Sequence, residues 1–188
     1  LCLILVILLA GAAFAQDRHP VSGREYAGVM GPAGADWLVR PEREAEEKPD
    51  LALKLIGIPK GGTVGDIGAG AGYLTWRLAA LVGPTGKVYA NDIQPEMLDL
   101  LRSNMRKRKI ANVETVLGTF DDPKLPANSL DLVILVDVYH EFAEPQKMLR
   151  RIRESLKPDG RLVLLEYRAE DPTVPIRPEH KMTVAQVK

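Results

Sequence analysis

Cysteine is nearly absent from this chain, which has 188 residues and one cysteine, Cys2. If the first residues are removed on export, no thiol remains for disulfide bonds, thiolate metal sites or cysteine nucleophiles. An excess of one charge is also lacking, because 25 Lys and Arg residues balance 25 Asp and Glu residues. This balance argues against a protein whose main partner is a nucleic acid. His19 and His180 lack metal-ligand spacing, so we predict no metal site.

Long hydrophobic runs are scarce as well, and the one present occupies residues 1–15 without a charge. At about 1.5 Å per residue it would reach roughly 22 Å, short of the ~30 Å hydrocarbon core of a bilayer. It ends in Ala13-Phe14-Ala15, which is typical of a signal-peptidase site. We expect a secretory signal peptide over residues 1–15 and an exported protein, periplasmic or secreted, with no stable membrane insertion after cleavage. The alternative is an uncleaved anchor helix.

The rest of the chain divides into an arm and a domain. Residues 16–40 are rich in Gly and Pro without a clear period, and they predict an N-terminal arm that either packs structurally or folds over a pocket as a lid. Residues 41–188 predict one folded domain. Because residue 1 is Leu and Thr183 reads as the N-cap of a helix that has only begun, we expect a fragment whose C-terminal strands are missing.

Strands and helices alternate regularly within the predicted domain. The apolar patterns predict helices over residues 41–56, 73–82, 95–109 and 144–156, and strands over residues 63–67, 87–91, 113–117, 130–138 and 161–167. Residues 157–160 are expected to form the loop before the last strand. This order predicts an α/β fold, a Rossmann-like doubly wound, mostly parallel sheet with helices on both faces.

Polar and glycine residues follow the first two predicted strands, where ligands bind in doubly wound sheets. Gly68, Gly70 and Gly72 alternate in a loop that lets the backbone approach a ligand. Asp92, 20 residues after Gly72, ends the second strand and can accept hydrogen bonds from a ribose diol. Together they predict an adenosine-containing ligand, either a dinucleotide or S-adenosylmethionine.

Two residues beside this loop favour S-adenosylmethionine. The dinucleotide fingerprint needs Gly or Ala three places after Gly70, where this chain has Tyr73. A carboxylate at Asp66 suits an amino-acid ammonium better than a pyrophosphate.

Four segments in order resemble motifs of the class I S-adenosylmethionine-dependent methyltransferases. They are residues 64–73, 91–98, 131–142 and 156–162. The match covers about residues 45–167 and is closest to the small-molecule branch, similar to quinone-biosynthesis methyltransferases. The resemblance implies S-adenosylmethionine as the cofactor and a small-molecule methyl acceptor.

The resemblance also implies roles for individual residues. Asp66 and the glycine loop with Tyr73 would hold the methionine end of the cofactor, and Asp92 with Ile93 would hold the ribose. Asp121, or Asp122 beside it, would lie near the adenine. The family has an acid directly after a glycine in this region, whereas here Thr119 follows the glycine.

The segment after the fourth predicted strand carries the candidate catalytic groups, His140 and Asp137. His140 is the preferred general base because its ordinary pKa lies near neutrality. The alternative is that His140 caps the next helix or bonds a neighbour. The segment lacks the prolines of enzymes that methylate nucleic-acid bases, which argues against such a substrate. We therefore expect in-line methyl transfer to a small molecule. A non-catalytic exported binding protein and a nicotinamide-dependent oxidoreductase are the alternatives.

Overall fold

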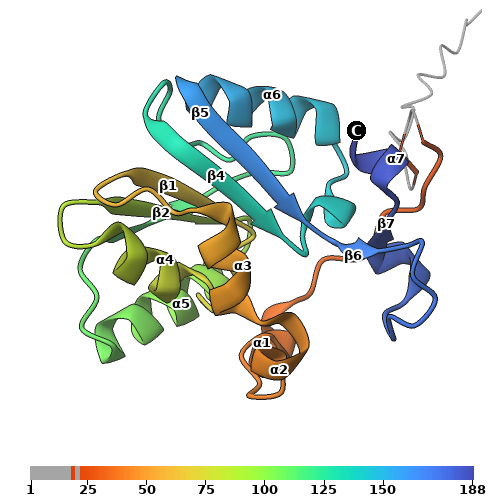
Figure 1. Cartoon of the computed structure of the whole chain (residues 1–188), viewed down its shortest axis with the longest axis horizontal. Helices are drawn as coiled ribbons and strands as arrows, with labels where there is room; N and C mark the ends of the chain where they lie inside the picture. Colours follow the sequence, from red (N-terminus) through yellow and green to blue (C-terminus); the bar gives the residue numbers. More distant parts are fainter. Residues whose placement is uncertain (1–17, 20–21) are drawn as a thin grey trace, which may run out of the picture.

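The computed structural model describes residues 18–19 and 22–188, so the predicted signal peptide lies outside the described residues. Its centre is a five-stranded sheet with the strand order β3-β2-β1-β4-β5 (Figure 1). The strands are β1 (Thr63–Ile67), β2 (Lys87–Asp92), β3 (Val113–Leu117), β4 (Leu130–Val136) and β5 (Leu156–Leu165). Every neighbouring pair is parallel. The predicted fold class is confirmed.

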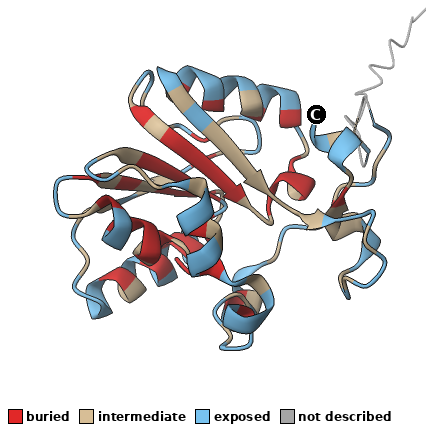
Figure 2. Ribbon diagram, viewed as in Figure 1, coloured by how far each residue is buried: buried red, intermediate tan, exposed pale blue. Residues whose placement is uncertain are grey.

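Helices cover both faces of this sheet. On one face lie α3 (Pro49–Ile56), α4 (Thr75–Val82) and α5 (Pro95–Lys107), and on the other lies α6 (Pro145–Ser155). Strand β4, which lies between β1 and β5, is buried along most of its length (Figure 2). Leu132 and Ile134 pack with α3 and α4, whereas Val133 and Leu135 pack with α6. This alternation explains the continuous apolar run, because a strand covered on both faces needs apolar side chains on both.

Several local boundaries differ from the sequence-based expectation; the strand predicted over residues 130–138, for example, ends at Val136. The helix predicted over residues 41–56 is divided into α2 (Arg43–Glu47) and α3, with Lys48 in the left-handed region at φ 48°. Pro49 disfavours a helical residue before it, and it then begins α3. The loop predicted at residues 157–160 belongs to β5, whose pairing with β4 is irregular between Leu130 and Leu132.

The segments at the two ends of the described chain are mostly short elements. The arm contains η1 (Pro32–Gly34) and α1 (Ala35–Leu38). After β5, strand β6 (Tyr167–Arg168) pairs with β7 (Lys181–Met182), while η3 (Pro178–His180) and α7 (Val184–Val187) complete the tail. Thr183 caps α7 through a capping box, as the sequence predicts.

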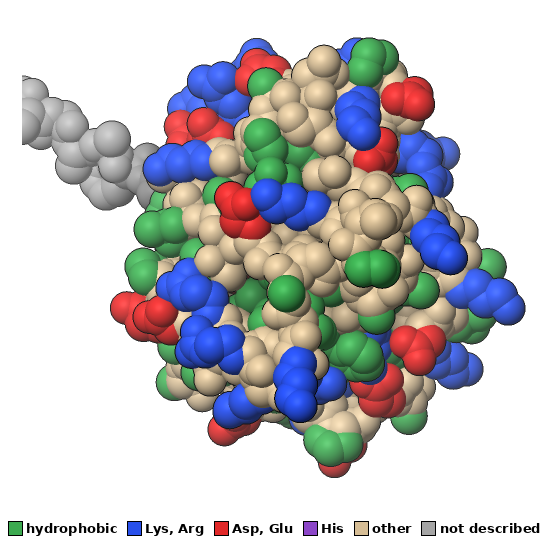
Figure 3. Space-filling model, turned by 90° about the vertical axis from the view of Figure 1, so that its left-hand side faces the viewer, with side chains coloured by type: hydrophobic (Ala, Val, Ile, Leu, Met, Phe, Trp, Pro, Cys, Tyr) green, Lys and Arg blue, Asp and Glu red, His purple; other side chains and the backbone are tan. Residues whose placement is uncertain are grey.

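The surface carries both signs of charge. On the face in Figure 3, Lys and Arg side chains alternate with Asp and Glu side chains, and neither sign covers a broad area. This matches the balanced composition. Within the part of the chain that the structure describes, no helix is long and apolar enough to cross a membrane.

Candidate active site

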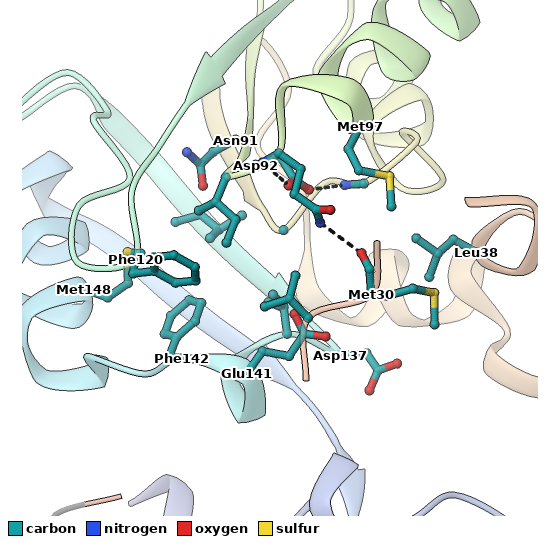
Figure 4. Close-up of a pocket in the computed structure, with 17 residues that line it drawn as sticks. Met30, Leu38, Asn91, Asp92, Met97, Phe120, Asp137, Glu141, Phe142 and Met148 are labelled. Atoms are coloured by element: carbon teal, nitrogen blue, oxygen red, sulfur yellow. Dashed lines mark hydrogen bonds between the residues drawn. The ribbon is translucent and has the colours of Figure 1, made fainter. Parts of the chain in front are cut away.

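A cavity lies beyond the carboxyl ends of β1, β2 and β4, and side chains of the arm close its other side (Figure 4). Gly68 and Gly70 come from the loop after β1, and Asp92 ends β2. Met30 and Leu38 reach the cavity from the arm. The strands are parallel, so they bring residues far apart in the sequence to one edge.

The glycine loop requires glycine for two reasons. Gly68 has φ +69°, and a Cβ atom there would lie 2.4 Å from Cγ2 of Val138. Gly70 has φ +52° and donates its backbone N–H to Oδ2 of Asp92 at 2.9 Å. A side chain at Gly68 would therefore collide with the segment after β4 and strain the backbone. Gly72 faces Met105 and Leu101 of α5 and does not line the cavity.

The Asp92 carboxylate accepts a hydrogen bond from the glycine loop and also lines the cavity. Its Oδ1 accepts the backbone N–H of Gln94 at 3.0 Å. Burial raises the pKa of Asp92, although the surrounding backbone N–H groups oppose the shift. A carboxylate has about four acceptor positions, so two backbone bonds leave capacity for a ligand. Ile93, the next residue, also lines the cavity.

A second cavity adjoins the first along the glycine loop. Asp66, Tyr73 and Arg43 line it, and the two cavities share four residues, Leu38, Gly68, Gly70 and Asp137. Oδ2 of Asp66 accepts the Thr75 hydroxyl at 2.6 Å, and burial raises the pKa of Asp66 to about 6. The Tyr73 ring lies 4.2 Å from the Arg43 guanidinium carbon. The two cavities therefore form one elongated site.

Asp137 is the predicted catalytic residue that the structure brings to this site. It follows β4 with φ 55° and lines both cavities. Its buried Oδ1 has no hydrogen-bond partner among the described residues, and Nδ1 of His140 lies 3.8 Å away. Burial raises the pKa of Asp137 to about 6, and the charge of Glu166 adds to the shift. An unpaired buried carboxylate oxygen is costly without a ligand, which marks it as a contact point.

His140 does not line either cavity, contrary to its predicted role as the base. Its ring is 1% exposed, and Nδ1 lies 2.6 Å from Oε2 of Glu166. Nε2 lies 3.0 Å from Nδ1 of His180. Both ring nitrogens are thus engaged with neighbours, which is the alternative arrangement that the sequence allowed.

The cluster of Asp137, His140 and Glu166 also has the composition of a metal site. One potential ligand atom from each lies within 4.8 Å of the others. However, Glu166 already accepts the backbone N–H groups of Val138 and Tyr139 besides its contact with His140. These contacts engage the ligand atoms of Glu166 and His140 but not that of Asp137, and the absence of a metal stays a prediction.

Neither of the residues predicted near the adenine, Asp121 and Asp122, lines the cavity. Asp121 is exposed, accepts the Thr119 hydroxyl at 2.8 Å and does not line the cavity. The backbone N–H of Thr119 donates to the Asp122 carbonyl at 2.8 Å, and this turn carries Asp121 outward. Phe120 lines the cavity instead (Figure 4).

Comparison with known proteins gives the family. A family model described as a methyltransferase domain matches residues 58–187. The chain belongs to the class I S-adenosylmethionine-dependent methyltransferases. The crystal structure of an S-adenosylmethionine-dependent methyltransferase from Aquifex aeolicus is similar, with 31% identity, a TM-score of 0.79 and coverage of 84% of each chain. The predicted family and cofactor are thereby confirmed.

Relatives with named substrates are more distant or are matched over less of their length. The ubiquinone/menaquinone biosynthesis C-methyltransferase UbiE of Escherichia fergusonii is 37% identical over 118 residues, 62% of this chain and 47% of that protein. The chain thus spans about half the length of the curated relatives it matches. The arsenic(III) S-adenosylmethionine methyltransferase CrArsM of Chlamydomonas reinhardtii is 28% identical, with a TM-score of 0.53 and coverage of 59% and 40% of the two chains.

The elongated site formed by the two cavities fits S-adenosylmethionine, the methyl donor of the family. Among the described residues, Oδ1 of Asp137 and the Tyr73 hydroxyl are buried without hydrogen-bond partners, and both residues line the cavity beside Asp66. An amino-acid group supplies both N–H donors and carboxylate acceptors, so it can satisfy an unpaired carboxylate oxygen and an unpaired hydroxyl. The elongated shape also separates this end of the site from the end that carries Asp92.

Sequence reasoning assigned no site role to several residues that line the two cavities, among them Arg43, Phe120 and Glu141. Arg43 faces the Tyr73 ring, Phe120 comes from the loop after β3, and Glu141 lines the first cavity together with Phe142. The sequence position of Glu141 could have indicated a site role, because Glu141 belongs to the segment after β4 in which the candidate catalytic groups lie. Arg43 had none, since a basic residue in a charged helix ordinarily faces solvent.

Proposed function

We propose that this protein transfers a methyl group from S-adenosylmethionine to a small organic molecule held between the glycine loop and the arm. The observation that carries the proposal is the closure of the site by the chain's own arm. Val29, Met30 and Leu38 line the same cavity as Gly68 and Asp92. A cavity walled by the strand ends on one side and the arm on the other suits a small molecule better than the broad surface of a macromolecule.

The donor end of the site consists of polar groups from the strand ends. S-adenosylmethionine supplies an electrophilic methyl group when bound. Asp92 would hold its ribose, and Asp66 with Tyr73 and Arg43 would hold its methionine end. Asp66 and Asp137 are acidic groups in a largely buried site, which favours a positively charged ligand.

The acceptor end is formed mainly by apolar side chains. Phe120, Phe142 and Met148 lie together on the side of the cavity away from α2 and α3, and Val29 comes from the arm (Figure 4). Such a wall can orient an apolar acceptor. Positioning is the main requirement of a displacement reaction, because the reacting atoms must be about 3 Å apart and aligned.

Binding measurements on the full chain test this proposal. Isothermal titration calorimetry with S-adenosylmethionine, its demethylated product S-adenosylhomocysteine and NAD should show binding of the first two only. A screen of small acceptors with S-adenosylmethionine labelled in the methyl group should then find transfer. Binding without transfer to any acceptor would favour the non-catalytic alternative, and absence of binding would contradict the proposal.

Export remains a separate proposal that rests on residues 1–15. We propose that this run directs the protein out of the cytoplasm and is removed. Expression of the chain behind its natural start, followed by fractionation and N-terminal sequencing, should recover a mature protein that begins at Gln16. Recovery of the uncleaved chain in the cytoplasm would contradict this proposal.

A further inference from the structure

All the charged side chains that line the first cavity, the one that contains Asp92 and Phe120, are acidic. Three carboxyl groups line the cavity, from Asp92, Asp137 and Glu141, while no Lys, Arg or His among the described residues lines it. Asp92 belongs to the donor end through its bond to the glycine loop, and Asp137 also lines the methionine-side cavity. Of the two cavities of the site, Glu141 lines only the first, which also contains Phe120 and Phe142. It is thus the carboxyl group that donor binding does not account for.

Glu141 stands in apolar surroundings. It belongs to the short helix η2 (Tyr139–Glu141), and Phe142 follows it directly. Figure 4 shows the Glu141 carboxylate between Phe142 and Asp137, with Phe120 and Met148 beyond Phe142. The Phe142 ring is itself held by Tyr139 in an edge contact with centroids 5.6 Å apart. Aromatic rings beside a carboxylate are suited to a ligand with an apolar body and a positive end.

The ionisation of Glu141 agrees with this geometry. Burial raises the pKa of Glu141 to about 7, and the charges of Asp137 and Asp92 contribute, while His140 and the Met30 backbone N–H oppose the shift. The carboxylate form is therefore held at a cost in the free protein. A cation beside it would offset that cost, whereas an anion would add to the repulsion.

We propose that the methyl acceptor is an amine, which binds as an ammonium ion against the Glu141 carboxylate with its apolar body on Phe120, Phe142 and Met148. This inference rests on the proposed function. An ammonium ion has no lone pair, so it must lose a proton before it can act as a nucleophile. Glu141 accepts that proton on a carboxylate oxygen, and the electron pair of the broken N–H bond stays on nitrogen as the lone pair. The products are a neutral amine and a carboxylic acid.

Three probes of nearly equal shape and different charge test the proposal. Phenethylamine, phenethyl alcohol and phenylacetate are titrated into the full chain in the presence of S-adenosylhomocysteine. We expect the amine to bind at least about 10-fold more tightly than the alcohol, since hydrogen bonds to charged groups contribute about 1.5–3 kcal/mol. Phenylacetate should bind most weakly. Equal binding of amine and alcohol, tighter binding of phenylacetate, or no binding of the amine would overturn the proposal.

Variants separate a ligand contact from a structural role. In Glu141→Gln the preference for the amine should fall to within about 3-fold of the alcohol, because the neutral amide keeps the shape and loses the charge. Glu141→Asp should retain the preference at lower affinity. Glu144→Gln is the matched control, since Glu144 is exposed three residues away and does not line the cavity. A full preference in Glu141→Gln would contradict the role of Glu141.

The expected loss of the amine preference in Glu141→Gln differs from what a purely structural role of Glu141 would give. It also differs from what a failure of the proposed function would give. If Glu141 only anchored the arm near Met30, Glu141→Gln would weaken all three probes equally and leave their order unchanged. If the proposed function failed, S-adenosylhomocysteine would not bind to the unsubstituted chain, or it would bind while no acceptor in the screen was methylated. If S-adenosylhomocysteine binds but the three probes bind equally, the proposal of an amine acceptor is overturned and the proposed function is not.

Discussion

Nε2 of His140 lies 3.0 Å from Nδ1 of His180, which comes 40 residues later in the chain. On its other side, His140 meets Glu166, whose Oε1 accepts two backbone N–H groups of the same turn. The contact with a carboxylate requires a proton on Nδ1 of His140. The imidazole therefore ties the tail of the chain and β5 to the segment that follows β4.

Replacement of His140 should consequently affect stability more than cofactor binding. We expect His140→Gln to lower the free energy of unfolding by about 1–3 kcal/mol, because it leaves buried polar partners unsatisfied. Affinity for S-adenosylhomocysteine should stay within about 3-fold of the unsubstituted protein, since His140 does not line the cavity. Urea denaturation and calorimetry measure the two quantities. His180→Gln removes only the second contact and should cost less.

The opposite pattern would restore His140 as a catalytic base. In that case stability and cofactor affinity would both be unchanged in His140→Gln, and only the rate of methyl transfer would fall.

Stability should decrease as the pH rises from about 5 to about 8. Burial raises the pKa of Asp66 to about 6, of Asp137 to about 6 and of Glu141 to about 7. Burial lowers the pKa of His140, but the hydrogen bond and charge of Glu166 outweigh it and raise the pKa overall. Each of these groups binds its proton more tightly in the folded state than in the unfolded state. Its contribution to the free energy of unfolding is therefore complete below the pKa of the unfolded state and is lost as the pH rises through the pKa of the folded state.

Asp66→Asn isolates one part of this dependence. The pKa of Asp66 rises from 3.8 to about 6, which corresponds to at most about 3 kcal/mol lost between about pH 4 and pH 7. The pKa of His180 is lowered by burial, so its contribution has the opposite sign below about pH 6.5. Urea denaturation at several pH values should show a shallower decline in Asp66→Asn than in the exposed control Asp99→Asn. Equal slopes would contradict the assignment.

Asp92→Ala should weaken binding of S-adenosylhomocysteine by about 10- to 100-fold. The substitution removes a ligand contact and also releases the backbone N–H groups of Gly70 and Gln94, each worth about 1 kcal/mol or more. Asp99→Ala is the matched control, because Asp99 is an exposed acid on α5. Calorimetry gives both affinities. Unchanged affinity in Asp92→Ala would remove the ribose assignment.

Local patterns predicted the sheet well and the side-chain partners of the site poorly. The apolar run at β4 and the glycine loop are patterns of neighbouring residues; the strand begins at Leu130 as predicted and ends two residues early at Val136, and the glycine loop follows β1 as predicted. The surroundings of His140 depend on Glu166 and His180, 26 and 40 residues away, which no local pattern reports. Likewise, one hydrogen-bonded turn at Thr119 decides that Phe120 and not Asp121 lines the cavity.

Gly68→Ala should disrupt the site although it adds only one methyl group. The new Cβ would lie 2.4 Å from Cγ2 of Val138, and φ +69° is unfavourable for alanine. Backbone strain of this kind costs about 1–3 kcal/mol before the collision is counted. We expect a lower melting temperature and loss of measurable S-adenosylhomocysteine binding. Gly28→Ala is the control, because nothing lies within 4 Å of a Cβ there, and it should behave as the unsubstituted protein does.

Arg24→Ala tests whether the arm closes the acceptor end. The Arg24 guanidinium donates to the carbonyl oxygens of His140 at 2.6 Å and Tyr139 at 3.2 Å, while the Ala27 backbone N–H also reaches the His140 carbonyl. These contacts hold the arm against η2, so their loss should raise hydrogen exchange in residues 22–31 by about 10-fold or more.

Small ligands of the acceptor end should then bind more weakly than before, because Val29 and Met30 would leave the wall of the cavity. Arg18→Ala is the control, since the Arg18–Glu25 ion pair is mostly exposed and lies outside these contacts. Unchanged exchange in Arg24→Ala would mean that apolar packing alone keeps the arm in place. Faster exchange without any loss of acceptor affinity would mean that the arm is not a wall of the acceptor site, and the argument from enclosure to a small-molecule substrate would fail with it.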